Sequence, residues 1–223
     1  MSRSKSRSRS TSKSRSRLHW SIALVLTLFA WALQIAAAGV SGRSTEDTPA
    51  PKSSKAASDS CSAKVKAMEA WAAQPDPKQH QTTRITEVEI NSYLALDLKA
   101  KFHPCLTSLQ LTFGEKHLSG TAGIDFDNLG MSAKGVAKLL ASLLSGKHQL
   151  SVSGVLVTGA GKGSFQLGEA RFDGNLLPNF IVSEIITAVG RKQRPPFDPL
   201  QPSQMLYAID KVDVHAGYII VYQ

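Results

Sequence analysis

The first 38 residues constrain this chain most, because they form a segment that suits a membrane, whereas the rest of the chain can fold in water. Residues 2–17 alternate serine with Lys or Arg and hold seven basic residues and no acidic residue. Residues 18–38 follow without Asp, Glu, Lys or Arg. A basic segment before an apolar run is typical of a signal peptide or a membrane anchor. The sequence therefore predicts an exported protein, either periplasmic or anchored in the inner membrane with its carboxyl-terminal domain outside the cytoplasm.

Two interpretations of the apolar run stay open. Its densest part, residues 22–33, has the length of a signal-peptide core, and Ala36 and Ala38 offer small residues for cleavage. Residues 20–38 are also long enough to cross a thin bilayer as a retained anchor. A rival interpretation takes the Arg/Ser repeats as a nucleic-acid-binding tail, but such a tail is not expected directly before an apolar run. We predict membrane contact through this segment and no nucleic-acid partner.

The composition indicates that the folded part is nearly neutral. The formal net charge is +9, from 26 basic and 17 acidic residues. Without the seven basic residues of the first segment, 19 basic residues stand against the same 17 acids. Residues 39–59 are rich in Ser, Thr, Pro and Ala, which predicts a flexible linker. Residues 60–223 are then long enough for a single domain with its own core.

Two cysteines lie in the part of the chain expected outside the cytoplasm, where oxidation is allowed. Residues 61–73 have apolar side chains at helical spacing, and residues 86–89 have the spacing of a capping box that starts a second helix. Two helices joined by a short loop tend to pack antiparallel, which would bring Cys61 close to Cys105. We predict a disulfide between them, and the alternative is two separate buried thiols.

In the remaining chain, apolar residues alternate with polar ones, as in half-buried strands. Three antiparallel hairpins are predicted, over residues 106–126, 149–173 and 212–222. Two amphipathic or apolar helices are predicted between them, over residues 131–144 and 178–189. The predicted fold class is α+β, with a mostly antiparallel, curved sheet of several hairpins packed with helices.

The helix over residues 178–189 has apolar side chains on most of its circumference. Its only polar residues after the initial proline are Asn179, Ser183, Glu184 and Thr187. An apolar helix of this kind must be buried on several sides or must face an apolar molecule that is not protein. Burial between a sheet and another helix is one interpretation, and a ligand-binding surface is the other.

No segment carries a recognisable catalytic or metal-binding motif. Lys162 lies in a glycine-rich turn but is followed by glycine and a strand, whereas a phosphate-binding loop needs Ser or Thr and a helix. Residues 125–130 begin like a calcium loop but place Leu129 where an oxygen ligand belongs. The histidines are scattered, and none forms a metal-ligand pair. We predict a protein that is not an enzyme and uses no metal or cofactor; the alternative is a hydrolase site assembled across loops.

The order of these features resembles the small exported bacterial proteins of the tubular lipid-binding (TULIP-like) kind. The likeness covers residues 60–223 and rests on the helix start at residues 85–94, the two long hairpins, the turn at Leu177 and Pro178 into an apolar helix, and the last hairpin. Resemblance to this family implies a curved sheet around a long helix, with a groove for acyl chains. It implies no catalytic residues.

The resemblance also implies a site. A lipid or another apolar small molecule would lie without chemistry between helix and sheet, in a groove lined by Leu140, Leu143, Leu144, Phe180, Ile181, Ile185 and Val189. The alternative is a structural or assembly protein of the cell envelope that holds no ligand and binds a protein partner through its apolar helix.

Overall fold

The structure of the protein is a computed structural model that describes residues 53–74, 79–129, 145–194, 196, 198 and 200–223. The expected signal peptide or anchor and the helix predicted over residues 131–144 lie outside the described residues. No helix in the described part of the chain is long and apolar enough to cross a membrane.

The first described helix, α2, spans Lys55–Ala73 and begins before the predicted start at Cys61. The Ser58 hydroxyl donates a hydrogen bond to Asp97 Oδ2 at 2.6 Å, so polar contacts hold the added turn. The buried side of α2 has helical spacing and consists of Ser58, Cys61, Val65 and Met68. The folded domain therefore includes the last residues of the stretch predicted as a linker.

The second helical segment begins at the predicted capping box. After strand β1 (Thr82–Thr86), helix α3 (Glu87–Tyr93) continues into η1 (Leu94–Leu98) and η2 (Lys99–Lys101). The Glu89 amide donates to Thr86 Oγ1 at 3.3 Å, and the Thr86 amide donates to Glu89 Oε2 at 2.8 Å. These two bonds satisfy donors that a helix start otherwise leaves free. The predicted capping box is confirmed.

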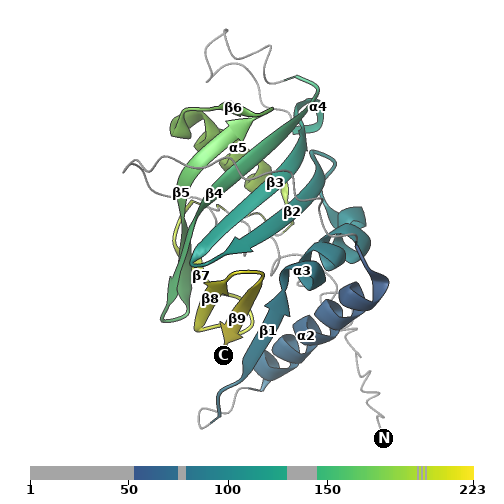
Figure 1. The fold of residues 1–223 in the computed structure, drawn as a ribbon, viewed down its shortest axis with the longest axis vertical. Coiled ribbons are helices and arrows are strands. Elements are labelled where there is room, and N and C mark those ends of the chain that lie inside the picture. The colour runs from purple at the N-terminus through teal and green to yellow at the C-terminus, as the bar shows by residue number, and fades with distance from the viewer. Residues whose placement is uncertain (1–52, 75–78, 130–144, 195, 197, 199) are drawn as a thin grey trace, which may run out of the picture.

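The larger sheet is antiparallel and has the strand order β2-β3-β4-β5-β6, with β7 also paired to β5 (Figure 1). Both long hairpins of the prediction are present in it. Its strands are β2 (Leu106–Gly114), β3 (His117–Asp125), β4 (Lys147–Gly159), β5 (Lys162–Phe172), β6 (Asn175–Leu176) and β7 (Ser203–Gln204). A short helix, α4 (Phe126–Leu129), follows β3.

A second, three-stranded sheet has the order β1-β9-β8. Strands β8 (Lys211–His215) and β9 (Tyr218–Tyr222) form the predicted last hairpin. Strand β1 was not predicted, and it pairs antiparallel with β9, from Thr82 opposite Tyr222 to Thr86 opposite Tyr218. The two sheets with their helices confirm an α+β fold of mostly antiparallel strands.

Helix α3 covers the free edge of the larger sheet. Strand β2 is the first strand of that sheet, so its outer backbone groups lack a strand partner. The Asn91 side chain takes the place of a strand: its Nδ2 donates to the Leu111 carbonyl at 2.7 Å, and its Oδ1 accepts from the Leu111 amide at 2.8 Å. One turn earlier, Glu87 Oε2 accepts from the Phe113 amide at 2.7 Å. These contacts fix the helix against the sheet.

One continuous hydrophobic core joins the helices and both sheets. Its buried members run from Cys61 to Val221, and they include the inward side chains of β2 to β5 and of helix α5 (Asn179–Lys192). Figure 1 shows α5 on one side of the larger sheet. A chain that starts at Ser53 therefore contains every residue of the described core and is suitable for experiments on the domain.

We expect Gly154→Ala to lower the free energy of unfolding by about 2 kcal/mol. An added Cβ would lie 1.9 Å from the Gln166 carbonyl oxygen and 2.7 Å from the Phe165 ring, so the backbone would have to move. Equilibrium urea denaturation measures the loss. In the same strand, a Cβ on Gly159 meets no atom within 4 Å, so Gly159→Ala should leave the unfolding midpoint nearly unchanged. Equal midpoints for the two variants would contradict this steric explanation.

Candidate ligand-binding site

Helix α5 carries the described half of the predicted groove. Pro178 precedes its first residue, and Arg191 and Lys192 lie in its last turn, where cations interact favourably with the helix dipole. Its buried residues follow one helical face and are Ile181, Val182, Ile185, Ile186, Val189 and Gly190. The helix is therefore more one-sided than its composition indicates, because its exposed residues gather on the opposite face.

Three of the predicted lining residues are core residues of the domain. Ile181, Ile185 and Val189 are 9%, 1% and 8% exposed and belong to the same cluster as the inward side chains of the sheet. The other predicted wall, formed by Leu140, Leu143 and Leu144, lies outside the described residues.

Phe180 is placed differently from the other lining residues. It lies in the first turn of α5, and its side chain is 70% exposed. Glu184 and Arg191, farther along the helix, are also exposed. Leu176, on the edge strand β6, is 64% exposed. The junction between β6 and α5 therefore presents two large apolar side chains to water, although Ile181 beside Phe180 is buried. We call Leu176 and Phe180 the apolar rim.

Both cysteines are buried, free thiols in the structure. Burial raises the pKa of Cys61 to about 12 and the pKa of Cys105 to about 11. Both side chains therefore stay protonated at neutral pH, which makes them poor nucleophiles. The two thiols are not bonded to each other in the structure. The disulfide between them stays a prediction.

His148 has the arrangement closest to a catalytic dyad. Its Nδ1 lies 2.6 Å from Asp173 Oδ2, and the hydrogen bond to this carboxylate raises the pKa of His148 above its ordinary value. Its Nε2, however, lies 2.7 Å from the Ser145 carbonyl oxygen, and its ring stacks on Phe172 with centroids 4.7 Å apart. With both nitrogens facing oxygen acceptors, the imidazole is held as a donor and has no nitrogen left to take a proton from a nucleophile.

The described residues contain no cluster of three or more His, Cys, Asp or Glu side chains that suits a metal ion. Around α5 the structure brings apolar residues together: one face of the helix, the inner side of the larger sheet and the apolar rim. The part of the chain that the structure describes is thus an α+β domain in which the buried face of α5 begins beside an exposed apolar rim. Comparison with protein-family models, with curated proteins and with solved structures found no match.

Proposed function

We propose that the protein is a non-enzymatic component of the cell envelope that binds a lipid or another apolar molecule between α5 and the larger sheet. The amino-terminal basic and apolar segments support an exported domain, as a periplasmic protein or one anchored in the inner membrane. The resemblance to the TULIP-like kind supports the same function.

The observation that carries this proposal is the apolar rim. Leu176 and Phe180 lie four residues apart and are both more than 60% exposed, at the point where the buried face of α5 begins. Large apolar side chains in water gain free energy when an apolar partner covers them, about 25 cal/mol for each Å² that is buried. An acyl chain that passes between these two side chains would reach Ile181 and Ile185 if helix and sheet separate. The rim is thus the proposed mouth of the site.

A second candidate function is supported by the outer face of the three-stranded sheet. Tyr218, Ile220 and Tyr222 alternate along β9 and are partly exposed, and the Arg84 guanidinium lies 3.9 Å from the centroid of the Tyr218 ring. Tyrosine and arginine are enriched where proteins bind one another. A structural or assembly protein that binds a protein partner through this face is therefore the alternative.

Native mass spectrometry of the chain Ser53–Gln223 tests the first candidate. The chain is exported from a bacterium with a generic signal peptide, purified without detergent and measured before and after denaturation. A lipid-binding protein should carry adducts of lipid mass that leave on denaturation. A bare chain, still bare after incubation with phospholipid, would exclude the lipid function and favour the partner-binding alternative.

We expect Phe180→Ser and Leu176→Ser each to lower the lipid-bound fraction about tenfold, because each removes apolar area at the proposed mouth. Both side chains are exposed, so the unfolding midpoint should change little. Val157→Ser is the matched control, since Val157 is 43% exposed but lies on β4, away from the rim. Equal loading of all three variants would place any bound lipid elsewhere. Ile185 is unsuitable for this test, because its replacement disrupts the core.

A further inference from the structure

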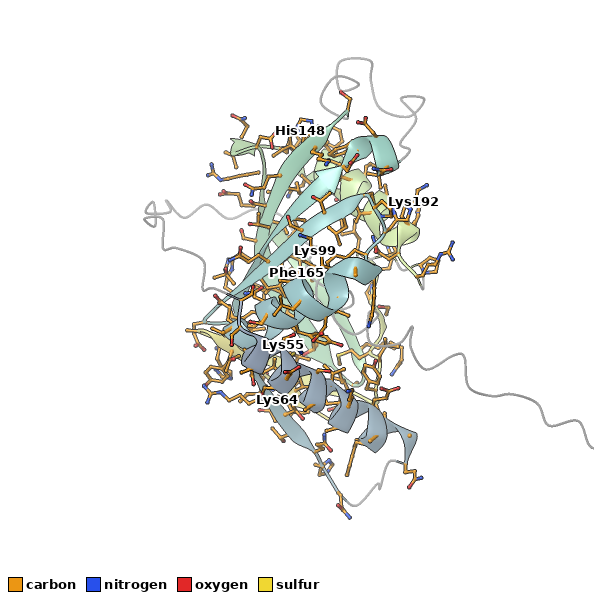
Figure 2. The ribbon with its side chains drawn as sticks, turned by 90° about the vertical axis from the view of Figure 1, so that its right-hand side faces the viewer. Lys55, Lys64, Lys99, His148, Phe165 and Lys192 are labelled. Carbon is orange, nitrogen blue, oxygen red and sulfur yellow. The ribbon has the colours of Figure 1, made fainter. Side chains whose placement is uncertain are left out.

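Five cations of the domain lie at the ends of two helical segments. Lys99 and Lys101 belong to η2, and Arg191, Lys192 and Arg194 end α5 and follow it; all five are exposed. Figure 2 shows Lys99 and Lys192 on these segments. We call the five residues the basic patch. Residues 53–223 hold 17 basic and 15 acidic residues, so the patch concentrates positive charge on a domain that is nearly neutral.

One buried side chain joins the two halves of the basic patch. Gln193, between Lys192 and Arg194, is 2% exposed, and its Oε1 accepts from the His103 amide at 3.4 Å. Its Nε2 donates to the Val189 carbonyl at 3.1 Å, which holds Gln193 against the end of α5. Since His103 follows Lys101 by two residues, this contact sets the end of η2 beside the end of α5. The patch is therefore held by the fold rather than by chance orientation of long side chains.

The basic patch has no anionic counterpart among the described residues. None of its five cations forms an ion pair there. Asp97, the acid closest to Lys99 in sequence, accepts a hydrogen bond from Ser58. The negative end of the α5 dipole favours Arg191 and Lys192, but it does not account for the cations that η2 adds to them. Five like charges repel one another, and an anionic partner would relieve that repulsion.

The position of the amino terminus favours a membrane as that partner. The Ser54 amide donates to Ser92 Oγ at 3.0 Å, and the Ser58 hydroxyl donates to Asp97 Oδ2 at 2.6 Å. The chain therefore enters the domain beside α3 and η1, the segments that lead to Lys99. Residues 39–53, between the apolar run and this point, can span at most about 50 Å when extended. Leu96, three residues before Lys99, is 49% exposed, and an apolar side chain beside cations suits the interface of a bilayer. Nucleic acid is less suitable, because Phe102, the aromatic residue of this segment, is buried rather than available for base stacking.

We propose that the basic patch docks the domain onto a bilayer surface rich in anionic phospholipid headgroups, with Leu96 at its edge. This inference is independent of the proposed ligand, because a domain can dock on a bilayer whether or not it extracts a lipid. It also gives a role to cations that the apolar site leaves unused.

Co-sedimentation of the chain Ser53–Gln223 with vesicles tests the docking. One set of vesicles contains phosphatidylcholine alone, and the other contains equal parts of phosphatidylcholine and phosphatidylglycerol. We expect binding to the anionic vesicles only, and weaker binding as the salt concentration rises. The variant Lys99→Gln/Lys192→Gln/Arg194→Gln should bind about a hundredfold more weakly, at about fivefold for each removed charge near the surface.

The matched control removes the same charge elsewhere. Lys66, Lys147 and Lys162 are exposed, and Lys66→Gln/Lys147→Gln/Lys162→Gln should retain most of the binding. If both triple variants bound anionic vesicles equally weakly, net charge alone would explain the binding, and the proposal that the basic patch is the docking surface would be wrong. Equal binding to neutral and anionic vesicles, or tighter binding to duplex DNA than to anionic vesicles, would overturn membrane docking. Lipid adducts in native mass spectra are measured separately, so either proposal can fail alone.

Discussion

Replacing Asn91 by leucine is expected to lower the free energy of unfolding by about 4 kcal/mol, because it leaves two buried backbone groups of the sheet edge without partners. In the folded protein, Asn91 bonds both the amide and the carbonyl of Leu111, and its side chain is 8% exposed. Leucine has the same number of heavy atoms and the same branching at Cγ, so it leaves no cavity and the loss reports mainly the hydrogen bonds. Equilibrium urea denaturation of the chain Ser53–Gln223 measures it.

A second replacement of an amide side chain by leucine, on β2 itself, is the control. Gln110 precedes Leu111 on β2, and its side chain lies on the outer face of the sheet, so Gln110→Leu should change the free energy of unfolding by less than about 0.5 kcal/mol. If Asn91→Leu were as mild as this control, the sheet edge would not depend on the side-chain pairing.

Replacing Glu89 by glutamine is expected to cost about 3 kcal/mol of stability at neutral pH and to cost progressively less in acid. Burial alone would raise the pKa of Glu89, but hydrogen bonds from Lys64, Ser60 and Thr86 outweigh it and lower the pKa to about 2. Lys64 Nζ lies 2.7 and 2.8 Å from the two carboxylate oxygens, and the Ser60 hydroxyl donates at 2.5 Å. The carboxylate thus joins α2 to the start of α3.

The direction of the pH dependence follows from the lowered pKa. A folded pKa of about 2, below the ordinary value of 4.5, means that Glu89 stabilises the fold above pH 4.5 and loses this contribution as the pH falls toward 2. The difference in unfolding free energy between wild type and Glu89→Gln should shrink over that window. Glu184 is exposed on α5, and Glu184→Gln should follow the wild-type profile. A constant difference between wild type and Glu89→Gln at all pH values would contradict the assignment.

Local sequence signals predicted most of the described elements. The three hairpins follow from period-two alternation and glycine-rich turns, and the start of α3 follows from Thr86 and Glu89 alone. Each of these signals lies within a few residues of the structure it predicts. The predicted helix at residues 178–189 is likewise present as α5, which continues past Gly190 to Lys192 because glycine, although unfavourable in a helix, is buried there among core residues.

The features that were not predicted depend on distant partners. Strand β1 is five residues long and pairs with β9, and the role of Asn91 requires the edge of β2, twenty residues later. The predicted nearness of Cys61 and Cys105 assumed two simple antiparallel helices, whereas the segment after α3 changes its helical form twice, at η1 and η2. Neither change has a signature in local composition.

The candidate site shows the same division between local and distant effects. The apolar character of α5 was visible in the sequence, but the exposure of Phe180 beside the buried Ile181 depends on where the sheet lies. The basic patch was missed because its cations come from two stretches about ninety residues apart, neither of which has a high charge density alone. The hydrogen bond from the His103 amide to Gln193 holds these two stretches side by side, so that their cations form one surface.

The order of strands in the smaller sheet affects how the protein can be made. Strand β9 lies between β1 and β8 although it is synthesised after both. Thr86, at the end of β1, therefore cannot pair with Tyr218 until β9 has been synthesised. During translation β1 has no partner in its own sheet until the ribosome has passed Tyr222, and pairing across so long a stretch of chain is slow. A fusion placed directly after Gln223 would therefore have to leave β9 free to reach the middle of its sheet.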